Sequence, residues 1–250
     1  MAQVRVVLAG ATGRAGSEVA RALRQEEGVH LVAGVARRQA GRDLGSALGG
    51  EPWDVPIHPT VDAALSVAAA DVLVDFTLAD VAGAHALAAL NRGVRPVVGA
   101  TGIPEAEVAA IVDASARTGL GAALIPNFSF GVMLLQRFAV EALRFFPAVE
   151  VIERHHDTKK DAPSGTAARL ARVLAAGGAR QPVPVHSVRL PGHVAHHEVV
   201  LGGLGEILTI RHDTTSRASW GPGVALAVRA VMGRPGVALD LADLVVADSV

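Results

Sequence analysis

The residues between Glu153 and Ala167 have the types and spacing needed to transfer protons and to bind an anion. They read E-R-H-H-D-T-K-K-D-A-P-S-G-T-A, so His155 and His156 are followed closely by Lys159. A histidine titrates near pH 6.5, at about neutrality, and a lysine supplies a fixed positive charge. These residue types predict a site for a small anionic substrate that gains a proton.

The last part of this segment is typical of the start of a helix. Ser164 is a suitable N-cap, which would leave the backbone N–H groups of Gly165, Thr166 and Ala167 without intrahelical acceptors. Such groups bind a carboxylate or a phosphate, helped by the helix dipole. A simple helix cap, with no ligand, is the alternative interpretation.

Histidines are concentrated in the second half of the chain, where seven of the ten lie between His155 and His212. A metal site is therefore an alternative for the histidine pair. However, no H-E-x-x-H motif occurs, and His193, His196 and His197 fall on one expected strand without helical ligand spacing. We expect no metal, a structural role for His186 and His212, and a surface position for Lys160.

A second anion-binding motif opens the chain. The residues G-A-T-G-R-A-G from Gly10 to Gly16 follow an apolar run and precede an amphipathic one. Glycine lets a backbone turn tightly and approach a pyrophosphate at a helix N-terminus. The spacing varies from G-x-G-x-x-G and also fits an ordinary glycine-rich turn, but its place after the first expected strand favours a dinucleotide.

The residues after the second expected strand bear on which dinucleotide binds. The segment reads Gly34-Val35-Ala36-Arg37-Arg38, with no acidic residue to hold the ribose hydroxyls of NAD. Arg37 could instead bind a 2′-phosphate, although a solvated basic loop would look the same. We predict that NADPH is preferred and NADH is the lesser alternative.

Two different element patterns divide the chain. Up to residue 126, continuous apolar strands alternate with helices, which predicts a Rossmann-like parallel sheet covered on both faces. The expected strands are Val4–Ala9, Leu31–Val35, Val72–Phe76, Pro96–Gly99 and Ala122–Ile125, and the expected helices include Ser17–Glu27 and Glu105–Arg117.

From residue 127 to 215 we expect an α+β domain with a mixed or antiparallel sheet. Its expected strands are Val149–Glu153, Val183–Arg189, His193–Leu201 and Glu206–His212, with turns at Pro191-Gly192 and Gly202-Gly203 and helices at Val132–Arg144 and Ser164–Ala176. The helical pattern of Ser216–Met232 is expected to return to the first domain, which would comprise residues 1–126 and 216–250.

Composition restricts the possible functions. The 250 residues are 50% apolar with a net charge of −1, so neither nucleic acid nor a membrane surface is an expected partner. The absence of cysteine excludes disulfides and thiolate chemistry and fits a cytoplasmic location. No apolar run approaches the roughly 20 residues of a membrane helix.

Taken together, these motifs resemble the 4-hydroxy-tetrahydrodipicolinate (dihydrodipicolinate) reductase family nearly end to end. Glu153 to Ala167 is similar to the family signature E-x-H-H-x-x-K-x-D-x-P-S-G-T-A at every defined position. Asp75-Phe76-Thr77, Gly99-Ala100-Thr101-Gly102 and Asn127-Phe128-Ser129-Phe130-Gly131 resemble its D-F-T, G-T-T-G and N-F-S-x-G segments, with Ala100 departing from a threonine.

The resemblance implies roles for individual residues. His155 would exchange a proton, Lys159 would donate one, and His156, Ser164, Gly165 and Thr166 would hold the substrate. The residues implied in cofactor binding are Gly10, Ala11, Thr12, Gly13, Arg14, Ala15, Phe76, Gly99, Ala100, Thr101, Ile125, Pro126, Asn127 and Phe128. It further implies reduction of a cyclic imine dicarboxylate in diaminopimelate and lysine biosynthesis, by a homotetramer built through the sheets of the second domain.

Ala36 departs from the family, which often has an acid there, and Ser216-Arg217 resembles a family segment whose role stays open. Two rival hypotheses remain. The chain could be another two-domain reductase of amino-acid metabolism, or a sensor that binds NADPH without turnover. A sensor has no need of a proton donor, so the H-H-x-x-K set argues against it.

Overall fold

The computed structural model describes residues 3–180 and 182–245, which form two compact units. Unit 1 holds the described residues up to Phe128 together with those from Trp220 onward, and unit 2 is Ser129–Ser219. No helix within the described residues is long and apolar enough to span a membrane.

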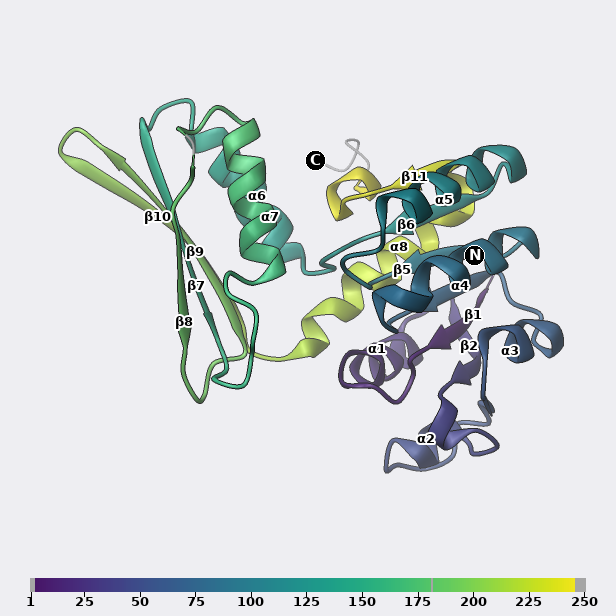
Figure 1. Cartoon of the computed structure of the whole chain (residues 1–250). Helices are drawn as coiled ribbons and strands as arrows, with labels where there is room; N and C mark the ends of the chain where they lie inside the picture. Colours follow the sequence, from purple (N-terminus) through teal and green to yellow (C-terminus); the bar gives the residue numbers. More distant parts are fainter. Residues whose placement is uncertain (1–2, 181, 246–250) are drawn as a thin grey trace. The chain divides into compact units, whose positions relative to one another are not determined.

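A seven-stranded sheet with the order β11-β6-β5-β4-β1-β2-β3 forms the centre of unit 1 (Figure 1). Its strands are β1 (Val4–Ala9), β2 (Val29–Val35), β3 (Ile57–His58), β4 (Val72–Asp75), β5 (Arg95–Val98), β6 (Gly121–Leu124) and β11 (Gly236–Ala238). Every strand pair is parallel, which confirms the prediction. Residues of β4 and β6 are buried throughout, as expected for strands covered on both faces.

Helices cover both faces of this sheet. Helices α1 (Arg14–Gln25) and α8 (Gly221–Gly233) pack together on one face. Helices α3 (Val61–Val67), α4 (Ala79–Asn91) and α5 (Glu105–Thr118) form the layer on the other face. The order of strands and helices therefore places the residues after β1, β4, β5 and β6 at one edge of the sheet.

Several elements of unit 1 differ from the sequence prediction. Helix α1 begins at Arg14 rather than Ser17, so its first three residues lie within the glycine motif. The sequence pattern also missed α2 (Leu44–Ala47), β3, α3, β11 and the 3-10 helices η1 (Arg37–Gln39) and η3 (Leu241–Leu244). Most of these elements are shorter than one full period of hydrophobic residues, so they leave little periodic pattern.

Unit 2 is a four-stranded mixed sheet, as predicted, with the order β10-β9-β7-β8. Its strands are β7 (Ala148–His155), β8 (Val185–Arg189), β9 (Ala195–Gly203) and β10 (Glu206–Thr214). Only the β7–β8 pair is parallel. Helices α6 (Phe130–Ala142) and α7 (Gly165–Ala176) cover one face and share with it a core that includes Leu135, Leu170, Leu174, Val151, Val199 and Leu201.

Three boundaries in and beside unit 2 correct the prediction. Strand β9 runs through Gly202 and Gly203, and the turn falls at Leu204-Gly205, where Gly205 has a φ of 77°. Strand β9 begins at Ala195, so His193 precedes it. The helix expected from Ser216 begins as the 3-10 helix η2 (Arg217–Trp220) and continues as α8.

Candidate active site

The glycine turn that connects β1 to α1 in unit 1 is tightly packed against neighbouring backbone. A Cβ atom on Gly16 would lie 2.1 Å from the carbonyl oxygen of Gly10, and one on Gly10 would lie 2.7 Å from that of Phe76. Gly10 also has a φ of 73°, which disfavours other residues. Gly13 is the N-cap of α1 and provides no side-chain cap. The turn therefore presents bare backbone at the positive end of a helix, which fits a pyrophosphate group.

The turn after β4 is held by a buried carboxylate. Asp75 is fully buried and accepts hydrogen bonds from Thr77 N–H (2.7 Å) and Thr77 Oγ1 (2.5 Å). His85 Nδ1 of α4 lies 2.7 Å from its second oxygen. These contacts fix the backbone on both sides of Phe76, whose ring lies against Gly99 so closely that a Cβ atom there would be 2.6 Å away.

A pocket lies at the carboxyl edge of the parallel sheet, beside these turns. Its lining includes eight of the predicted cofactor residues: Ala15, Phe76, Gly99, Ala100, Thr101, Pro126, Asn127 and Phe128. In an open α/β sheet, ligands bind outside the carboxyl ends of the strands. Of the remaining predicted residues, Gly10 to Arg14 lie at the turn from β1 to α1, Ile125 follows β6 and Arg37 follows β2; Ala11 and Ile125 are buried.

Aromatic rings shape this pocket. The ring of Trp220 stacks on Phe76 at 6.3 Å between centroids and 15° between planes, and Phe128 lies 5.6 Å from Phe76 on another side. Trp220, Thr77, Leu78 and Ala79 also line the pocket, and sequence reasoning missed them. Trp220 is distant in sequence from every other lining residue, so no local motif could have found it.

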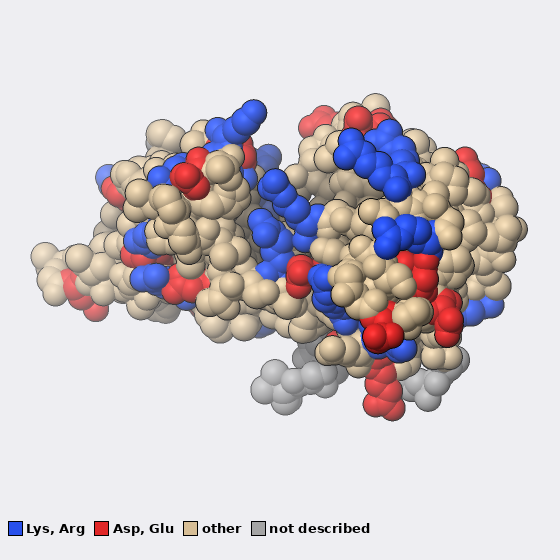
Figure 2. Space-filling model, turned by 90° about the horizontal axis from the view of Figure 1, so that it is seen from below, with Lys and Arg blue, Asp and Glu red and all other residues tan. Residues whose placement is uncertain are grey.

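The two arginines after β2 are exposed at the surface of unit 1. Arg37 begins η1 directly after Ala36, whose short side chain provides no acceptor for a ribose hydroxyl. Gly34 and Val35 of β2 pair with Ile57 and His58 of β3. Figure 2 shows that basic and acidic side chains are interspersed on the face drawn, in agreement with the net charge of −1.

In unit 2, the buried face of strand β7 begins with apolar residues and ends with the first residues of the Glu153–Ala167 motif. Alternate residues Val149, Val151, Glu153 and His155 are buried, so all four point toward α6 and α7. Glu153 and His155 thus continue the inward face of the strand, and β7 extends two residues beyond the predicted end. His155 Nδ1 lies 2.5 Å from Glu153 Oε2.

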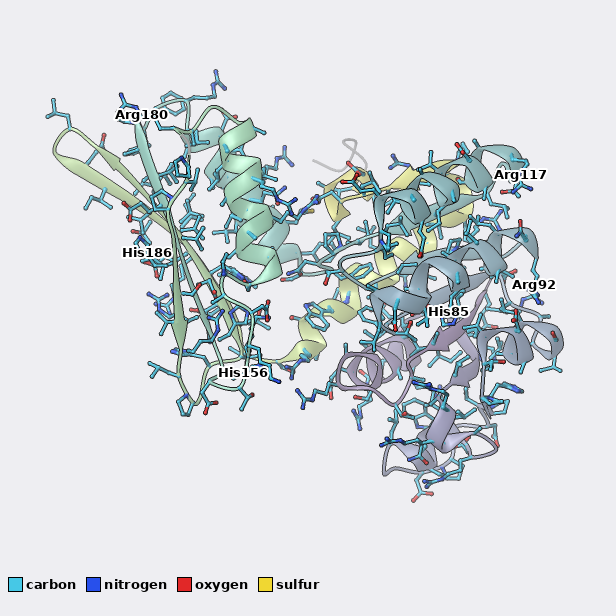
Figure 3. The ribbon with its side chains drawn as sticks, viewed as in Figure 1. His85, Arg92, Arg117, His156, Arg180 and His186 are labelled. Atoms are coloured by element: carbon cyan, nitrogen blue, oxygen red, sulfur yellow. The ribbon has the colours of Figure 1, made fainter. Side chains whose placement is uncertain are left out.

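The other members of the motif lie on the loop after β7. Lys159 Nζ donates to Asp161 Oδ1 at 2.7 Å, and the side chain of Lys159 is 22% exposed. His156 is half-buried, with Nδ1 2.7 Å from Thr158 Oγ1. Figure 3 shows His156 at one end of the sheet of unit 2. Lys160 is exposed, as expected for a surface charge.

Helix α7 begins as the sequence predicts, with one difference. Ser164 is the N-cap, and its Oγ accepts a hydrogen bond from Ala167 N–H at 3.2 Å. The N–H of Ala167 is therefore occupied by the cap, contrary to expectation. Gly165 is exposed at the first helical position, and a Cβ atom there would meet no protein atom within 4 Å.

Protonation states in unit 2 follow from burial and hydrogen bonding. Burial alone would raise the pKa of Glu153, but hydrogen bonds from Arg189, Ser187, His155 and Ser164 N–H lower this pKa to about 2. Burial is the main cause that lowers the pKa of His155, and it outweighs the opposite effect of Glu153. Glu153 is consequently ionised at neutral pH.

Four of the remaining histidines of unit 2 lie near one another on and beside β9 and β10: His212 pairs with His197, and the rings of His193 and His196 are 4.9 Å apart between centroids. His197 is buried on β9 directly opposite Glu153, and burial lowers its pKa to about 3. His186 pairs with Glu150 at 2.7 Å and projects from the sheet away from α6 and α7 (Figure 3). Within residues 3–180 and 182–245, no three His, Asp or Glu side chains form a group that could hold a metal ion.

The fold and the site define the chain as an oxidoreductase with a Rossmann-like unit and a separate mixed-sheet unit. Family models described as "Dihydrodipicolinate reductase, N-terminus" and "Dihydrodipicolinate reductase, C-terminus" match residues 4–128 and 131–245. The chain therefore belongs to the dihydrodipicolinate reductase family, whose enzymes act in diaminopimelate and lysine biosynthesis.

Individual relatives agree with the family models. The chain is 48% identical to the 4-hydroxy-tetrahydrodipicolinate reductase of Symbiobacterium thermophilum over 98% of both chains, and 44% identical to that of Moorella thermoacetica with the same coverage. The solved structure of a dipicolinate-bound dihydrodipicolinate reductase from Paenisporosarcina sp. TG-14 is 32% identical, with a TM-score of 0.85 over 97% of this chain and 100% of that one.

Proposed function

We propose that this chain reduces 4-hydroxy-tetrahydrodipicolinate (dihydrodipicolinate) to tetrahydrodipicolinate, with His155 and Lys159 as the proton-transfer residues. The observation that carries the proposal is the His155–Glu153 contact at 2.5 Å, close to the start of α7 and within the family-matched half of the chain. A reduction adds a hydride and a proton, so the protein must provide a group that can deliver the proton. In this proposal unit 1 binds the nucleotide and unit 2 binds the substrate.

The substrate carries two carboxylates, and unit 2 offers groups suited to them. Lys159 supplies a positive charge, and the exposed start of α7 at Gly165 supplies a backbone donor at the positive end of a helix. His156 and Thr166 are the further residues that we propose for substrate binding, and Ser164 supports them as the cap of α7. Charge that develops during reduction would be stabilised by Lys159.

The nicotinamide coenzyme supplies the hydride when it is bound. Its pyrophosphate would lie on the N–H groups of the Gly10–Gly16 turn, and its nicotinamide end would lie among Phe76, Thr101 and Asn127 of the pocket. We propose NADPH as the preferred form, because Ala36 leaves no acid for the ribose and Arg37 is exposed next to it.

The test of the reaction is NADPH oxidation by the purified chain, with the substrate generated in the cuvette by a coupled synthase. We expect oxidation that depends on the synthase product and yields tetrahydrodipicolinate. NADPH binding without substrate-dependent oxidation would favour a nucleotide sensor instead. Oxidation with a different imine or keto acid only would favour another reductase of amino-acid metabolism.

The coenzyme preference has its own test. Replacing Arg37 with alanine should lower kcat/KM for NADPH about tenfold, the loss expected for one charge-assisted hydrogen bond, and should leave NADH within about twofold. Arg24, exposed at the end of α1, provides a control in which Arg24→Ala changes neither value. Equal or better efficiency with NADH in the unaltered protein would contradict the proposal.

We further propose a cytoplasmic homotetramer assembled through the sheet of unit 2. Large apolar side chains near the β9–β10 turn are exposed in the single chain, among them Leu204 at 104% and Ile207 at 73%. Exposed apolar groups of this size favour burial in an assembly. Light scattering coupled to size-exclusion chromatography should give four times the mass of one chain, and Ile207→Lys should lower it.

A further inference from the structure

We propose that Arg189 and Glu153 are the positioning pair of the proton-transfer site, because together they fix the proton on His155 Nδ1 and leave Nε2 as the reactive atom. This inference rests on the proposed role of His155. Neither residue contacts the substrate in this proposal, so each acts through the histidine and the loop that it holds. Arg189 lies outside every motif of the sequence.

The carboxylate of Glu153 has a full set of donors. Its Oε2 accepts from His155 Nδ1 at 2.5 Å and from Arg189 Nη1 at 2.9 Å. Its Oε1 accepts from Arg189 Nη2 at 2.7 Å and from Ser164 N–H at 3.2 Å. An ionised carboxylate has about four acceptor sites and no donor, so these four bonds, with the Ser187 side chain as a further donor, use all its capacity.

This arrangement determines the tautomer of His155. Because a carboxylate can only accept, the ring must donate from Nδ1, which leaves the proton exchange of the neutral ring to Nε2. Nε2 has no hydrogen-bond partner among the residues that the structure describes. The side chain of His155 is 9% exposed, so its orientation is set by the protein rather than by water.

Arg189 extends the same contacts to the lysine loop. Arg189 forms two hydrogen bonds to Glu153, and its Nη2 also donates to the carbonyl oxygen of Asp161 at 2.7 Å. The carboxylate of Asp161 in turn accepts from Lys159 Nζ at 2.7 Å. One arginine and one glutamate thus connect His155 on β7, Lys159 on the loop and Ser164 at the start of α7. A guanidinium suits this task because its donors form a rigid planar fork.

Glu153 and Arg189 have opposite effects on the pKa of His155, so their contributions can be distinguished. Glu153 on β7 favours the protonated ring, whereas Arg189 on β8 and Lys159 on the loop disfavour it. His197 on β9 meets the ring edge-on at 5.5 Å between centroids and is itself neutral at pH 7. Loss of the glutamate charge must therefore lower the pKa of His155, and loss of the arginine charge must raise it.

The experiment is an NMR titration of the full-length chain with ¹⁵N-labelled histidine, in which His155→Gln identifies the His155 signals. We expect the Nδ1–H tautomer in the unaltered protein, a lower His155 pKa in Glu153→Gln and a higher one in Arg189→Met. Arg154→Met is the matched control, because Arg154 forms a 2.9 Å ion pair with Glu198 on the other side of β7 and should leave the titration unchanged.

Kinetics provide the second readout. Glu153→Gln should lower kcat by on the order of 10²-fold with KM for NADPH unchanged, since the amide can stabilise the wrong tautomer. Arg189→Lys, which keeps the charge, should retain more activity than Arg189→Met. An Nε2–H tautomer in the unaltered protein overturns the proposal and requires no variant to fold.

The proposed function can fail separately from this inference. If His155→Gln keeps a near-native rate, His155 is not the proton-transfer residue, whatever its tautomer. If that variant is inactive but the pKa of His155 moves in the same direction in Glu153→Gln and Arg189→Met, the positioning pair is wrong and the catalytic role stands.

Discussion

At the scale of single residues, two side chains in unit 2 carry the proton-transfer hypothesis. His155 is buried with its orientation fixed by Glu153, and Lys159 is partly exposed on a loop. The pKa of His155 is lowered mainly by burial, so the imidazolium is a minority form in the free protein at pH 7. A dicarboxylate bound beside it would favour the protonated form.

Replacing either residue should lower turnover strongly. We expect His155→Gln and Lys159→Ala each to reduce kcat by on the order of 10²-fold or more, because one loses the proton carrier and the other the adjacent charge. Steady-state NADPH oxidation measures this. The chain offers matched controls in His186→Gln and Lys160→Ala, which alter exposed residues of the same types. Near-native rates in both site variants would disprove the assignment.

The sequence predicted His155 and Lys159 but not Arg189, for a physical reason. The motif from Glu153 to Ala167 is contiguous, so its members and their chemistry can be read directly. The alternation of Val149, Val151, Glu153 and His155 on one strand also indicates that a charge is buried and needs a partner. Arg189 becomes this partner through the pairing of β7 with β8, and the spacing of residues along one segment cannot predict which strands pair.

At the scale of elements, the two helix N-termini proposed to bind anions differ in the space around their glycine residues. At the start of α1, Gly16 is required by the protein itself, since a Cβ atom would lie 2.1 Å from a carbonyl oxygen. At the start of α7, Gly165 has open space around its Cβ position. We infer that the first glycine serves the fold and the second leaves room for the substrate.

This difference gives opposite expectations for two alanine substitutions. Gly16→Ala should destabilise the protein by about 1–3 kcal/mol through overpacking and should weaken NADPH binding. Gly165→Ala should leave stability within about 1 kcal/mol and raise KM for the substrate about tenfold. Thermal unfolding and substrate titration separate the two. An unchanged KM in Gly165→Ala, matching the control Gly233→Ala in α8, would count against the substrate site.

Long, strongly patterned elements were predictable, and short ones were not. Strand β1 was predicted to its residue limits and α5 to within one residue of its end, because buried apolar runs and helical spacing are local properties. Strand β3 has two residues and exists only because Gly34 and Val35 of β2 pair with it. The pocket residue Trp220 likewise belongs to no motif, and it lies in the pocket because the chain re-enters unit 1 there after unit 2.

At the scale of the whole molecule, buried ionisable groups make the fold sensitive to acid. The pKa of His197 is about 3 in the folded chain, compared with about 6.5 for an unperturbed histidine. Between these values the unfolded chain binds more protons, so the free energy of unfolding falls as the pH falls. Glu153, with a pKa of about 2 in the fold, adds a second decline below about pH 4.5.

Replacement of His197 should make stability less dependent on pH. Urea unfolding between pH 7 and pH 4 should show a slope shallower by up to about 1.4 kcal/mol per pH unit in His197→Leu than in the unaltered chain. His30 is exposed on β2, so His30→Gln serves as the control with an unchanged slope. Equal slopes in all three proteins would show that His197 also titrates normally in the fold.

The insertion of unit 2 between β6 and α8 has a consequence for synthesis of the chain on the ribosome. Helix α8 covers β5 and β6, and β11 pairs with β6, yet both are translated after the whole of Ser129–Ser219. Until they emerge, β6 is an unpaired sheet edge beside uncovered apolar strands, a combination that promotes aggregation. A fragment that stops at Phe128 is therefore expected to aggregate rather than to form a smaller nucleotide-binding protein.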